Sequence, residues 1–297
     1  MVATHVSPDG LDDLVLAIAP GHKPALTPDN SRHWSPPPVG HHRCCHNVRV
    51  TTVAALRIHL CGTFVVERDG QRLDRDLPGK QGQLLVAYLT CNRHRPVRRA
   101  ELIDAIWPDP PAAPDSALNA LVSKARRVLG SSAIDGRSTL QLRLDDAWID
   151  VEAAIDGVHR AESAVAVGDW SRAWGPSLVA LFTAQREFLP EHDTPWVDQE
   201  RGRLAEIHLR ALEAYVTSCV GIGGTELVAG VRAGRELVRL APLRESGHQL
   251  LMRALASQGN VAEALRVYSD LCTILRDELG VSPCAATRAI HDQLLTA

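Results

Sequence analysis

The sequence lacks the usual features of membrane and secreted proteins. No uncharged apolar run in its 297 residues approaches the roughly 18 residues that a membrane-spanning helix needs. Near the N-terminus, Asp12 and Asp13 stand where a signal peptide has basic residues. The seven cysteines include no CxxC pair, and an odd number without a regular framework favours reduced thiols over disulfides. We therefore expect a cytoplasmic protein that has no structural zinc site.

The sequence motifs of common enzymes are also missing. There is no GxxxxGK[ST], GxSxG or HExxH motif. A Gly-Ile-Gly-Gly run at 221–224 follows an expected helix rather than a strand, which indicates a turn and not a phosphate-binding loop. Four cysteines lie on segments of apolar periodicity, where small core residues are expected: Cys61, Cys91, Cys219 and Cys272. We expect a protein that is not an enzyme and has no catalytic residue, cofactor or metal.

The composition is that of an ordinary globular protein. With 45% hydrophobic and 23% charged residues, the chain is neither collagen, coiled coil nor wholly disordered. Residues 57–150 contain fourteen basic and twelve acidic side chains, whereas residues 151–297 contain fourteen basic and nineteen acidic ones. An excess of two positive charges is weak evidence for a polyanionic partner, so that hypothesis depends on where the charges lie.

Residues 1–56 are predicted to form a poorly ordered arm. They hold seven of the eighteen prolines and six of the thirteen histidines, with few large apolar residues to offset the entropy of ordering the chain. Several side chains in the arm are able to bind a soft metal: His33, His41, His42, Cys44, Cys45 and His46. Their spacing matches no regular zinc pattern, which favours accidental ligands in a flexible tail.

Strand and helix patterns follow one another from residue 57 to residue 150. Alternating apolar residues and an Asp69-Gly70 turn indicate a β-hairpin. After Pro78-Gly79, and again over 98–107, leucines and isoleucines recur at helical spacing. We therefore expect a hairpin followed by two short helices.

A third helix and a second hairpin are expected after a proline-rich loop. Asp115 or Ser116 is a suitable N-cap for this helix, and Gly130 is a suitable stop. Residues 139–144 and 148–151 are predicted to pair with each other across a turn at Asp145-Asp146. Strands, three helices and a final hairpin within about 95 residues are typical of a winged helix-turn-helix, whose last helix lies in a DNA major groove.

Beyond Asp150 the sequence predicts only helices. The expected spans are 151–167, 170–182, 195–219, 225–239, 243–257, 261–279 and 284–295. Ala229 and Ala264 lie 35 residues apart, close to the 34-residue period of tetratricopeptide repeats. The predicted fold is thus an α+β winged helix-turn-helix domain over 57–150, followed by an all-α tetratricopeptide-like domain over 151–297.

The surface of the third helix indicates a function. Placing its residues at 100° intervals puts leucines and other apolar residues on an inward face: Leu118, Leu121, Val122, Ala125 and Leu129. The outward face has small, hydrogen-bonding and cationic residues, which we expect to contact DNA bases: Ser116, Asn119, Ala120, Ser123 and Arg127.

These residue types suit a DNA groove. Small residues allow close approach, Asn119 can bond adenine through two hydrogen bonds, and Arg127 can do the same to guanine. Nearby cations are expected to contact phosphates or an adjacent minor groove: Lys124, Arg126, Arg98, Arg99 and Arg137. Arg93 and Arg95 belong to the same basic cluster at the start of the second helix. For the third helix alone, a merely solvated charged face is the alternative.

The chain resembles the Streptomyces antibiotic regulatory protein family, transcription activators of actinobacteria that join an OmpR-like winged helix to a bacterial transcriptional activation domain. In the first module the matching segments are LCGTFVVERDG at 60–70, GKQ at 79–81, ELIDAIW at 101–107 and LNALVSKARRVLG at 118–130. In the second they are APLRE at 241–245, GNVAEAL at 259–265, Tyr268, and LRDELGVSP at 275–283. The resemblance covers residues 57–297.

This resemblance implies binding to direct repeats in double-stranded promoter DNA by a homodimer, and recruitment of RNA polymerase through its σ and α subunits. The polymerase-contacting surface of the family is the loop between the second and third helices, here Trp107, Pro108, Asp109, Pro110 and Pro111. The sequence departs from the family pattern at Asp115, where an arginine is common. An adaptor that binds proteins and has lost DNA binding is the alternative.

Overall fold

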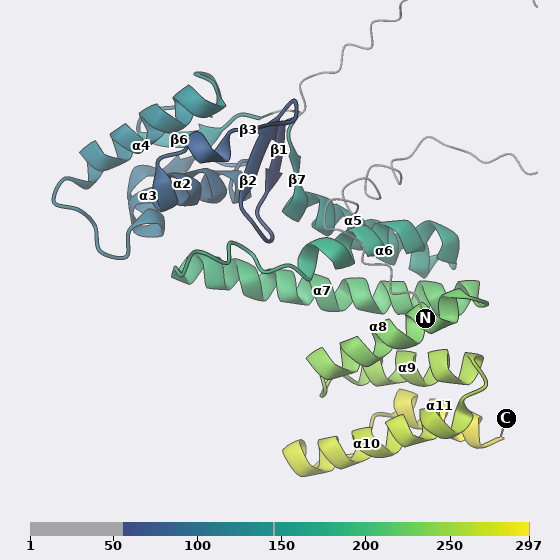
Figure 1. The fold of residues 1–297 in the computed structure, drawn as a ribbon. Coiled ribbons are helices and arrows are strands. Elements are labelled where there is room, and N and C mark those ends of the chain that lie inside the picture. The colour runs from purple at the N-terminus through teal and green to yellow at the C-terminus, as the bar shows by residue number, and fades with distance from the viewer. Residues whose placement is uncertain (1–55, 145, 297) are drawn as a thin grey trace, which may run out of the picture. The chain divides into compact units, whose positions relative to one another are not determined.

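The computed structural model describes residues 56–144 and 146–296 (Figure 1). The described residues all lie within one compact unit of the chain, Ala54–Ala297. The predicted arm and its candidate metal ligands therefore lie outside the described residues. Among the helices that the structure describes, none has both the length and the apolar character needed to cross a membrane.

A small mixed sheet opens the described chain. Strands β1 (Leu56–His59), β2 (Val65–Arg68), β3 (Gln71–Arg72) and β7 (Trp148–Ile149) lie in the order β3-β2-β1-β7. β1 and β2 are antiparallel, with Ile58 opposite Val66. The turn that follows β2 contains Asp69 and Gly70, both with positive φ. β2 and β3 pair across this turn, with Arg68 opposite Gln71, so the predicted hairpin is confirmed, although its second strand ends at Arg72.

Three helices follow a short 3-10 turn, η1 (Asp74–Asp76): α2 (Gly79–Cys91), α3 (Arg99–Ile106) and α4 (Pro114–Leu129). α4 ends at Gly130, which has a φ of 108°, as predicted. The predicted N-cap is wrong, because α4 begins at Pro114 and the N-cap position is Ala113, which makes no side-chain capping bond. Proline suits the first helical position since its fixed φ is helical and its missing N–H has no partner to lose.

The predicted second hairpin is also wrong. The strand β6 (Thr139–Leu142) pairs with β5 (Ile134–Asp135) and with β4 (Val97–Arg98), in a separate sheet of order β4-β6-β5. The strand β7 instead pairs in parallel with β1, which places Ile149 opposite Ile58 and buries both side chains. The β5–β6 hairpin, called the wing hairpin below, turns at Gly136.

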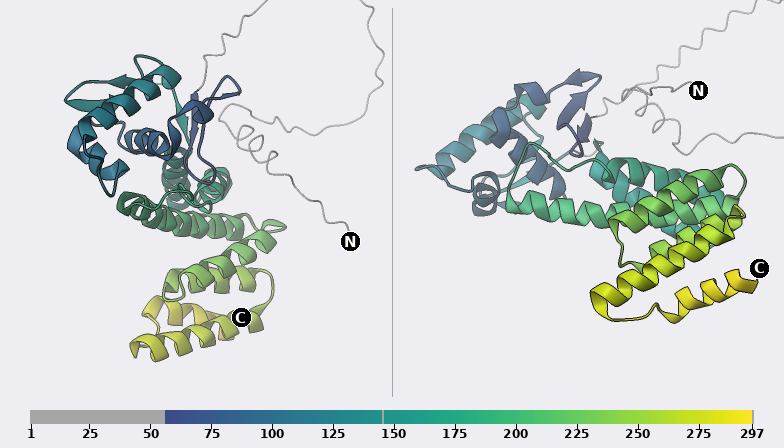
Figure 2. Two further views of the ribbon diagram at one scale, coloured as in Figure 1. Left: turned by 60° about the vertical axis from the view of Figure 1, so that its left-hand side comes forward. Right: turned by 60° about the horizontal axis from the view of Figure 1, so that its bottom comes forward.

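The rest of the chain is helical (Figure 2). Its helices are α5 (Asp150–Ala166), α6 (Trp170–Ala184), α7 (Pro195–Ile222), α8 (Glu226–Leu240), α9 (Glu245–Ser257), α10 (Val261–Leu279) and α11 (Ala285–Thr296). Each of these seven agrees with a predicted span to within about two or three residues. Consecutive helices from α5 to α11 pack against one another, and α7 also contacts α5 and α9. A Cβ atom at Gly230 would lie 2.8 Å from Cys219 Cβ, so a glycine permits the close approach of α8 to α7.

The hydrophobic core of the N-terminal half includes side chains from beyond residue 150. Phe188 and Leu189 are each 1% exposed and pack with β1, α2 and their neighbours. They belong to the segment 185–194 between α6 and α7, here called the strap. The backbone of the strap is bonded to the residues that follow β1, from Gly62 N to Glu187 O at 2.7 Å and from Leu189 N to Leu60 O at 2.9 Å.

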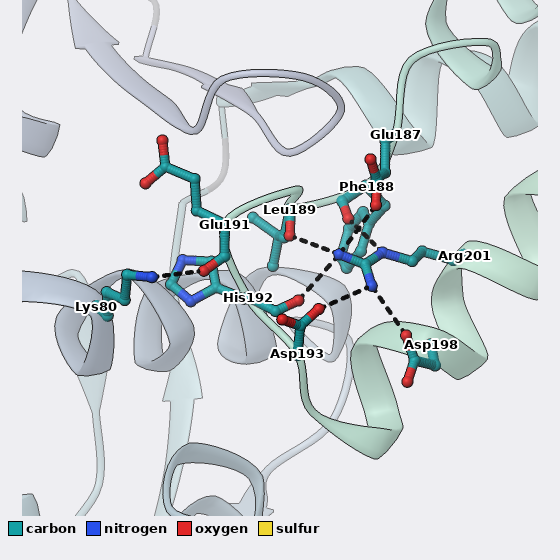
Figure 3. A network of polar contacts seen from close by, with 9 residues as sticks. All are labelled: Lys80, Glu187, Phe188, Leu189, Glu191, His192, Asp193, Asp198 and Arg201. Carbon is teal, nitrogen blue, oxygen red and sulfur yellow. Dashed lines mark hydrogen bonds and ion pairs between the residues drawn. The ribbon is translucent and has the colours of Figure 1, made fainter.

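Arg201 on α7 holds the strap from the other side (Figure 3). Its guanidinium donates to the backbone oxygens of Phe188 and Leu189, both at 3.0 Å, and of His192 at 2.9 Å. Lys80 on α2 donates to the backbone oxygen of Glu191 at 2.9 Å. The strap is thus held between the two halves of the chain. Four of its backbone oxygens accept hydrogen bonds from Arg201 or Lys80.

Candidate nucleic-acid interface

The helix α4 separates its residues into two faces, as its sequence predicts. Four apolar residues of the inward face are buried: Leu118, Val122, Ala125 and Leu129. Leu121 lies at the edge and is half-buried. The residues proposed to contact bases are all exposed: Ser116, Asn119, Ala120, Ser123 and Arg127. No described part of the chain covers this outward face, so it is open to a large ligand.

A hollow of about 350 Å³ lies between α4 and the wing hairpin. It is lined by Arg99, Asn119, Val122, Ser123, Arg126, Gly136, Arg137 and Leu140. Three arginines, an amide and a hydroxyl thus surround an open depression, and no acidic side chain is among the lining residues. Cations and hydrogen-bond donors arranged in this way suit the phosphate backbone of a nucleic acid.

Arg126 joins α4 to the wing hairpin. Its Nε donates to the backbone oxygen of Ile134 and its Nη2 to that of Gly136, both at 2.9 Å. Two of the three guanidinium nitrogens are therefore committed within the protein. The sequence predicted a phosphate contact for Arg126. In the structure, two of its donors bond the wing hairpin to α4.

Arg99 is held in a similar way. Its side chain is 21% exposed, and its Nε donates to the carboxylate of Asp115 at 2.9 Å. The Nη2 donates to the side-chain oxygen of Asn119 at 3.1 Å, and the Nη1 to the backbone oxygen of Arg137 at 3.4 Å. Arg99 thus links α3, α4 and the wing tip, which leaves it poorly placed for the predicted phosphate contact.

Four other cations remain available on this side of the chain. Within the described residues, no side-chain hydrogen bond or ion pair engages Arg98, Lys124, Arg127 or Arg137, and all four are exposed. Arg98 lies on β4, Lys124 and Arg127 on α4, and Arg137 at the wing tip. The structure therefore places these predicted contact residues on three neighbouring elements with their charges unpaired.

The helical half of the chain resembles a known domain family. Residues 149–295 match the model of the bacterial transcriptional activator domain. The chain is 33% identical to the regulatory protein AfsR of Streptomyces coelicolor over 247 residues, which is 82% of this chain and 24% of AfsR. It is 30% identical to the transcriptional regulator RedD of the same organism over 237 residues, 71% of this chain and 63% of RedD. The chain thus contains a bacterial transcriptional activator domain and resembles the Streptomyces antibiotic regulatory protein family.

A solved structure has the same fold. Mycobacterium tuberculosis EmbR, in complex with a low-affinity phosphopeptide, superposes with a TM-score of 0.71 at 23% identity. The match covers 81% of this chain and 65% of the EmbR chain. The chain thus spans about a quarter of AfsR and just under two thirds of RedD and EmbR.

The loop between α3 and α4 is accessible. Trp107 is half-buried and its backbone N–H donates to the oxygen of Ile103 at 2.9 Å, which closes α3. Pro108, Asp109 and Pro110 are exposed, and Pro111 is half-buried. The loop residues predicted to contact polymerase therefore include three that a partner is able to reach.

Two arginines of the basic cluster have structural roles in this protein. Arg93 forms an ion pair with Glu152 of α5 at 2.6 Å and donates to the backbone oxygen of Leu144 at 2.9 Å. Arg95 pairs with Glu101, and this contact holds the pKa of that carboxyl below its usual range. The sequence grouped both residues with the DNA contacts, since charge spacing does not show which carboxylates the fold brings near.

Three cysteine thiols of the described residues offer little reactivity. Burial raises the pKa of Cys61 and of Cys91 well above the ordinary value, and it raises the pKa of Cys219 to about 11. A protonated, buried thiol is a small apolar residue rather than a nucleophile. In the part of the chain that the structure describes, no group of three His, Cys, Asp or Glu side chains is arranged to hold a metal ion.

Proposed function

We propose that this protein is a transcriptional regulator, namely a sequence-specific DNA-binding activator of a biosynthetic pathway. Residues 57–150 act as a winged helix-turn-helix and residues 151–297 as a tetratricopeptide-like activation domain, and the protein works in the cytoplasm. The observation that carries the proposal is the open outward face of α4 beside a wing hairpin whose tip is fixed by Arg99 and Arg126.

The helix α4 enters a major groove with Ser116, Ala120 and Ser123 close to the bases. These small side chains allow the helix backbone to approach, while Asn119 and Arg127 form hydrogen bonds to base edges. Arg98 and Lys124 neutralise phosphates on either side of the groove. Arg137 at the wing tip reaches the adjacent minor groove, where narrow width favours a cation.

Two protomers bind direct repeats side by side. A single module of this size buries about 600–1,000 Å² on DNA, which is usually too little for strong specificity, so a second copy supplies the remaining contacts. The loop at Trp107, Pro108, Asp109, Pro110 and Pro111 then faces RNA polymerase and contacts its σ and α subunits. Its exposed prolines suit a rigid contact surface, because they lose little conformational entropy on binding.

Salt dependence of DNA binding tests this proposal. For a fragment retained from the organism's own genome, the logarithm of affinity falls steeply with the logarithm of salt concentration if several phosphates are neutralised. Lys124→Ala is expected to make that slope shallower by about one unit. Arg172→Ala is a matched control, since Arg172 is an exposed cation on α6 and its loss leaves the slope unchanged.

A protein-binding adaptor is the second candidate function. The observation in its favour is Asp115, a carboxylate that is 73% exposed in the first turn of α4, where it repels phosphates. An adaptor without DNA binding shows no salt-dependent affinity for any fragment, with or without Lys124. That result would replace the activator proposal by the adaptor.

A further inference from the structure

The guanidinium of Arg99 is surrounded by hydrogen-bond acceptors. Two of them lie on α4 one helical turn apart, the carboxylate of Asp115 and the amide oxygen of Asn119. Another is the backbone oxygen of Asp115, 3.2 Å from Nη2, and the last is the backbone oxygen of Arg137 at the wing tip. Residues four apart on a helix share a face, so α4 offers Arg99 both side chains at once.

This contact determines which atom of Asn119 points outward. A side-chain amide has an oxygen that accepts and a nitrogen that donates, and an arginine side chain has donors only. The atom of Asn119 that meets Arg99 Nη2 at 3.1 Å must therefore be Oδ1. Asn119 is exposed, and within the described residues no contact engages its Nδ2, which is free to present two N–H groups while Oδ1 is engaged by Arg99.

We propose that Arg99 is a positioning residue that makes Asn119 a donor-only reader of one base. This inference rests on the proposed function, because it assumes that α4 lies in a major groove. An asparagine bonds adenine by accepting from N6 and donating to N7, which requires its oxygen to face the base. With Oδ1 held by Arg99, Asn119 matches guanine instead, since guanine N7 and O6 are adjacent acceptors.

Two features favour the persistence of the contacts among Arg99, Asp115 and Asn119 when the protein binds DNA. The carboxylate of Asp115 compensates the charge of Arg99, so the guanidinium has less attraction to a nearby phosphate. Turning the amide of Asn119 toward adenine would remove an acceptor from Arg99 Nη2, leaving it only the backbone oxygen of Asp115. The preference for guanine thus depends on the side chains of Asp115, Arg99 and Asn119, of which only Asn119 contacts the base.

The preferred base at one operator position tests the inference. We first select DNA fragments from a randomised library with the wild-type protein and with Asn119→Ala, which identifies the position whose preference that variant loses. Duplexes with each of the four bases at this position are then titrated with the wild type and with Arg99→Ala. The wild type is expected to favour guanine over adenine by about fivefold or more.

Arg99→Ala is expected to bind DNA and to shift the preference at that position toward adenine, because Oδ1 becomes free. Arg126 still holds Gly136 in this variant, which keeps the wing hairpin in place. Arg99→Lys is the second variant should the alanine protein not fold, since a lysine can pair with Asp115 but lacks the fork that reaches Asn119. It is expected to show the same shift.

Four results would overturn the inference. A wild-type preference for adenine at the Asn119 position contradicts the donor-only amide. An equal loss of affinity for all four bases in the Arg99 variants, with a shallower salt slope, makes Arg99 a phosphate contact. Absence of salt-dependent binding to any DNA overturns the proposed function as well, whereas salt-dependent binding with unchanged base preference overturns the role of Arg99 alone.

Discussion

The indole N–H of Trp196 donates to the backbone oxygen of Ala105 at 3.0 Å, although the two residues are 91 positions apart in the sequence. The Trp196 ring also meets the edge of Tyr88, with ring centroids 5.0 Å apart. The first turn of α7 thus contacts both α2 and α3. The N-terminal half of this protein is not stabilised by its own residues alone, and the helical half contributes directly to its core.

Phe188→Ala is expected to destabilise the protein by about 3–5 kcal/mol, because it leaves a cavity in the core of the N-terminal half. Urea unfolding followed by circular dichroism measures the change in the free energy of unfolding. Val167→Ala is the control, since Val167 is 76% exposed and its loss is expected to cost less than about 0.5 kcal/mol. Equal stability of the two variants would show that the strap does not belong to this core.

Acid is expected to weaken the attachment of the strap through His192. This side chain is buried and its Nε2 lies 3.0 Å from Gln83 Oε1. Burial, with a smaller contribution from Lys80, lowers the pKa of His192 below 6.5. As the pH falls below 6.5 the unfolded chain binds a proton that the folded chain does not, so the stability contributed by neutral His192 is lost.

His192→Gln is therefore expected to lose less stability than the wild type between about pH 6.5 and 5. Burial also lowers the pKa of His208 and of His248, so the dependence is reduced and not abolished. Urea unfolding at a series of pH values measures both profiles. Parallel profiles for the two proteins would rule out a neutral, buried His192 as a source of the acid sensitivity.

Gly136→Ala is expected to disorder the tip of the wing hairpin. Gly136 has a φ of 95°, and a Cβ atom would lie 2.0 Å from the backbone oxygen of Thr139. The strain is expected to cost about 1–3 kcal/mol and to weaken DNA binding, since Arg137 loses its fixed position. Gly202→Ala is the matched control, because nothing lies near its Cβ and it is on the helix α7. If both variants bind DNA like the wild type, the tip has no part in the interface.

Arg126 and Arg137 are expected to differ in their effects, although both line the hollow beside α4. Arg137→Ala removes an unpaired cation, so it lowers affinity and makes the salt slope shallower by about one unit with little change in stability. Arg126→Ala leaves two wing carbonyls without donors and lowers the melting temperature as well. Calorimetry and salt titration separate the two effects. The opposite assignment, with Arg137 the residue that affects melting, would contradict the structure.

The helices of this protein could be predicted from sequence because their apolar residues recur over many turns. The helix α10, for example, begins and ends at the predicted residues 261 and 279. The predicted partner of β7 was wrong, since Trp148 and Ile149 pair with residues about 90 positions away. A two-residue strand is too short for its sequence pattern to indicate which strand it pairs with. Long-range pairing is a property of the whole core and not of the segment.

The outward face of α4 could likewise be predicted, since helical periodicity alone divides Leu118 from Asn119. What the sequence could not show is which charges are already engaged. Arg99 and Arg137 are both arginines beside the same helix, yet only the folded chain brings Asp115 and a wing carbonyl to Arg99. The predicted contact residues therefore include two, Arg99 and Arg126, whose guanidinium groups are engaged within the protein.

The most direct test of the central claim is the ratio of affinities for a genomic fragment that the protein retains and for a scrambled fragment of the same length. If α4 reads bases, Arg127→Ala lowers this ratio by about fivefold to 150-fold, whereas Arg172→Ala leaves it unchanged. A ratio that is the same for the wild type and Arg127→Ala, measured at one salt concentration, would contradict base reading by this face of α4.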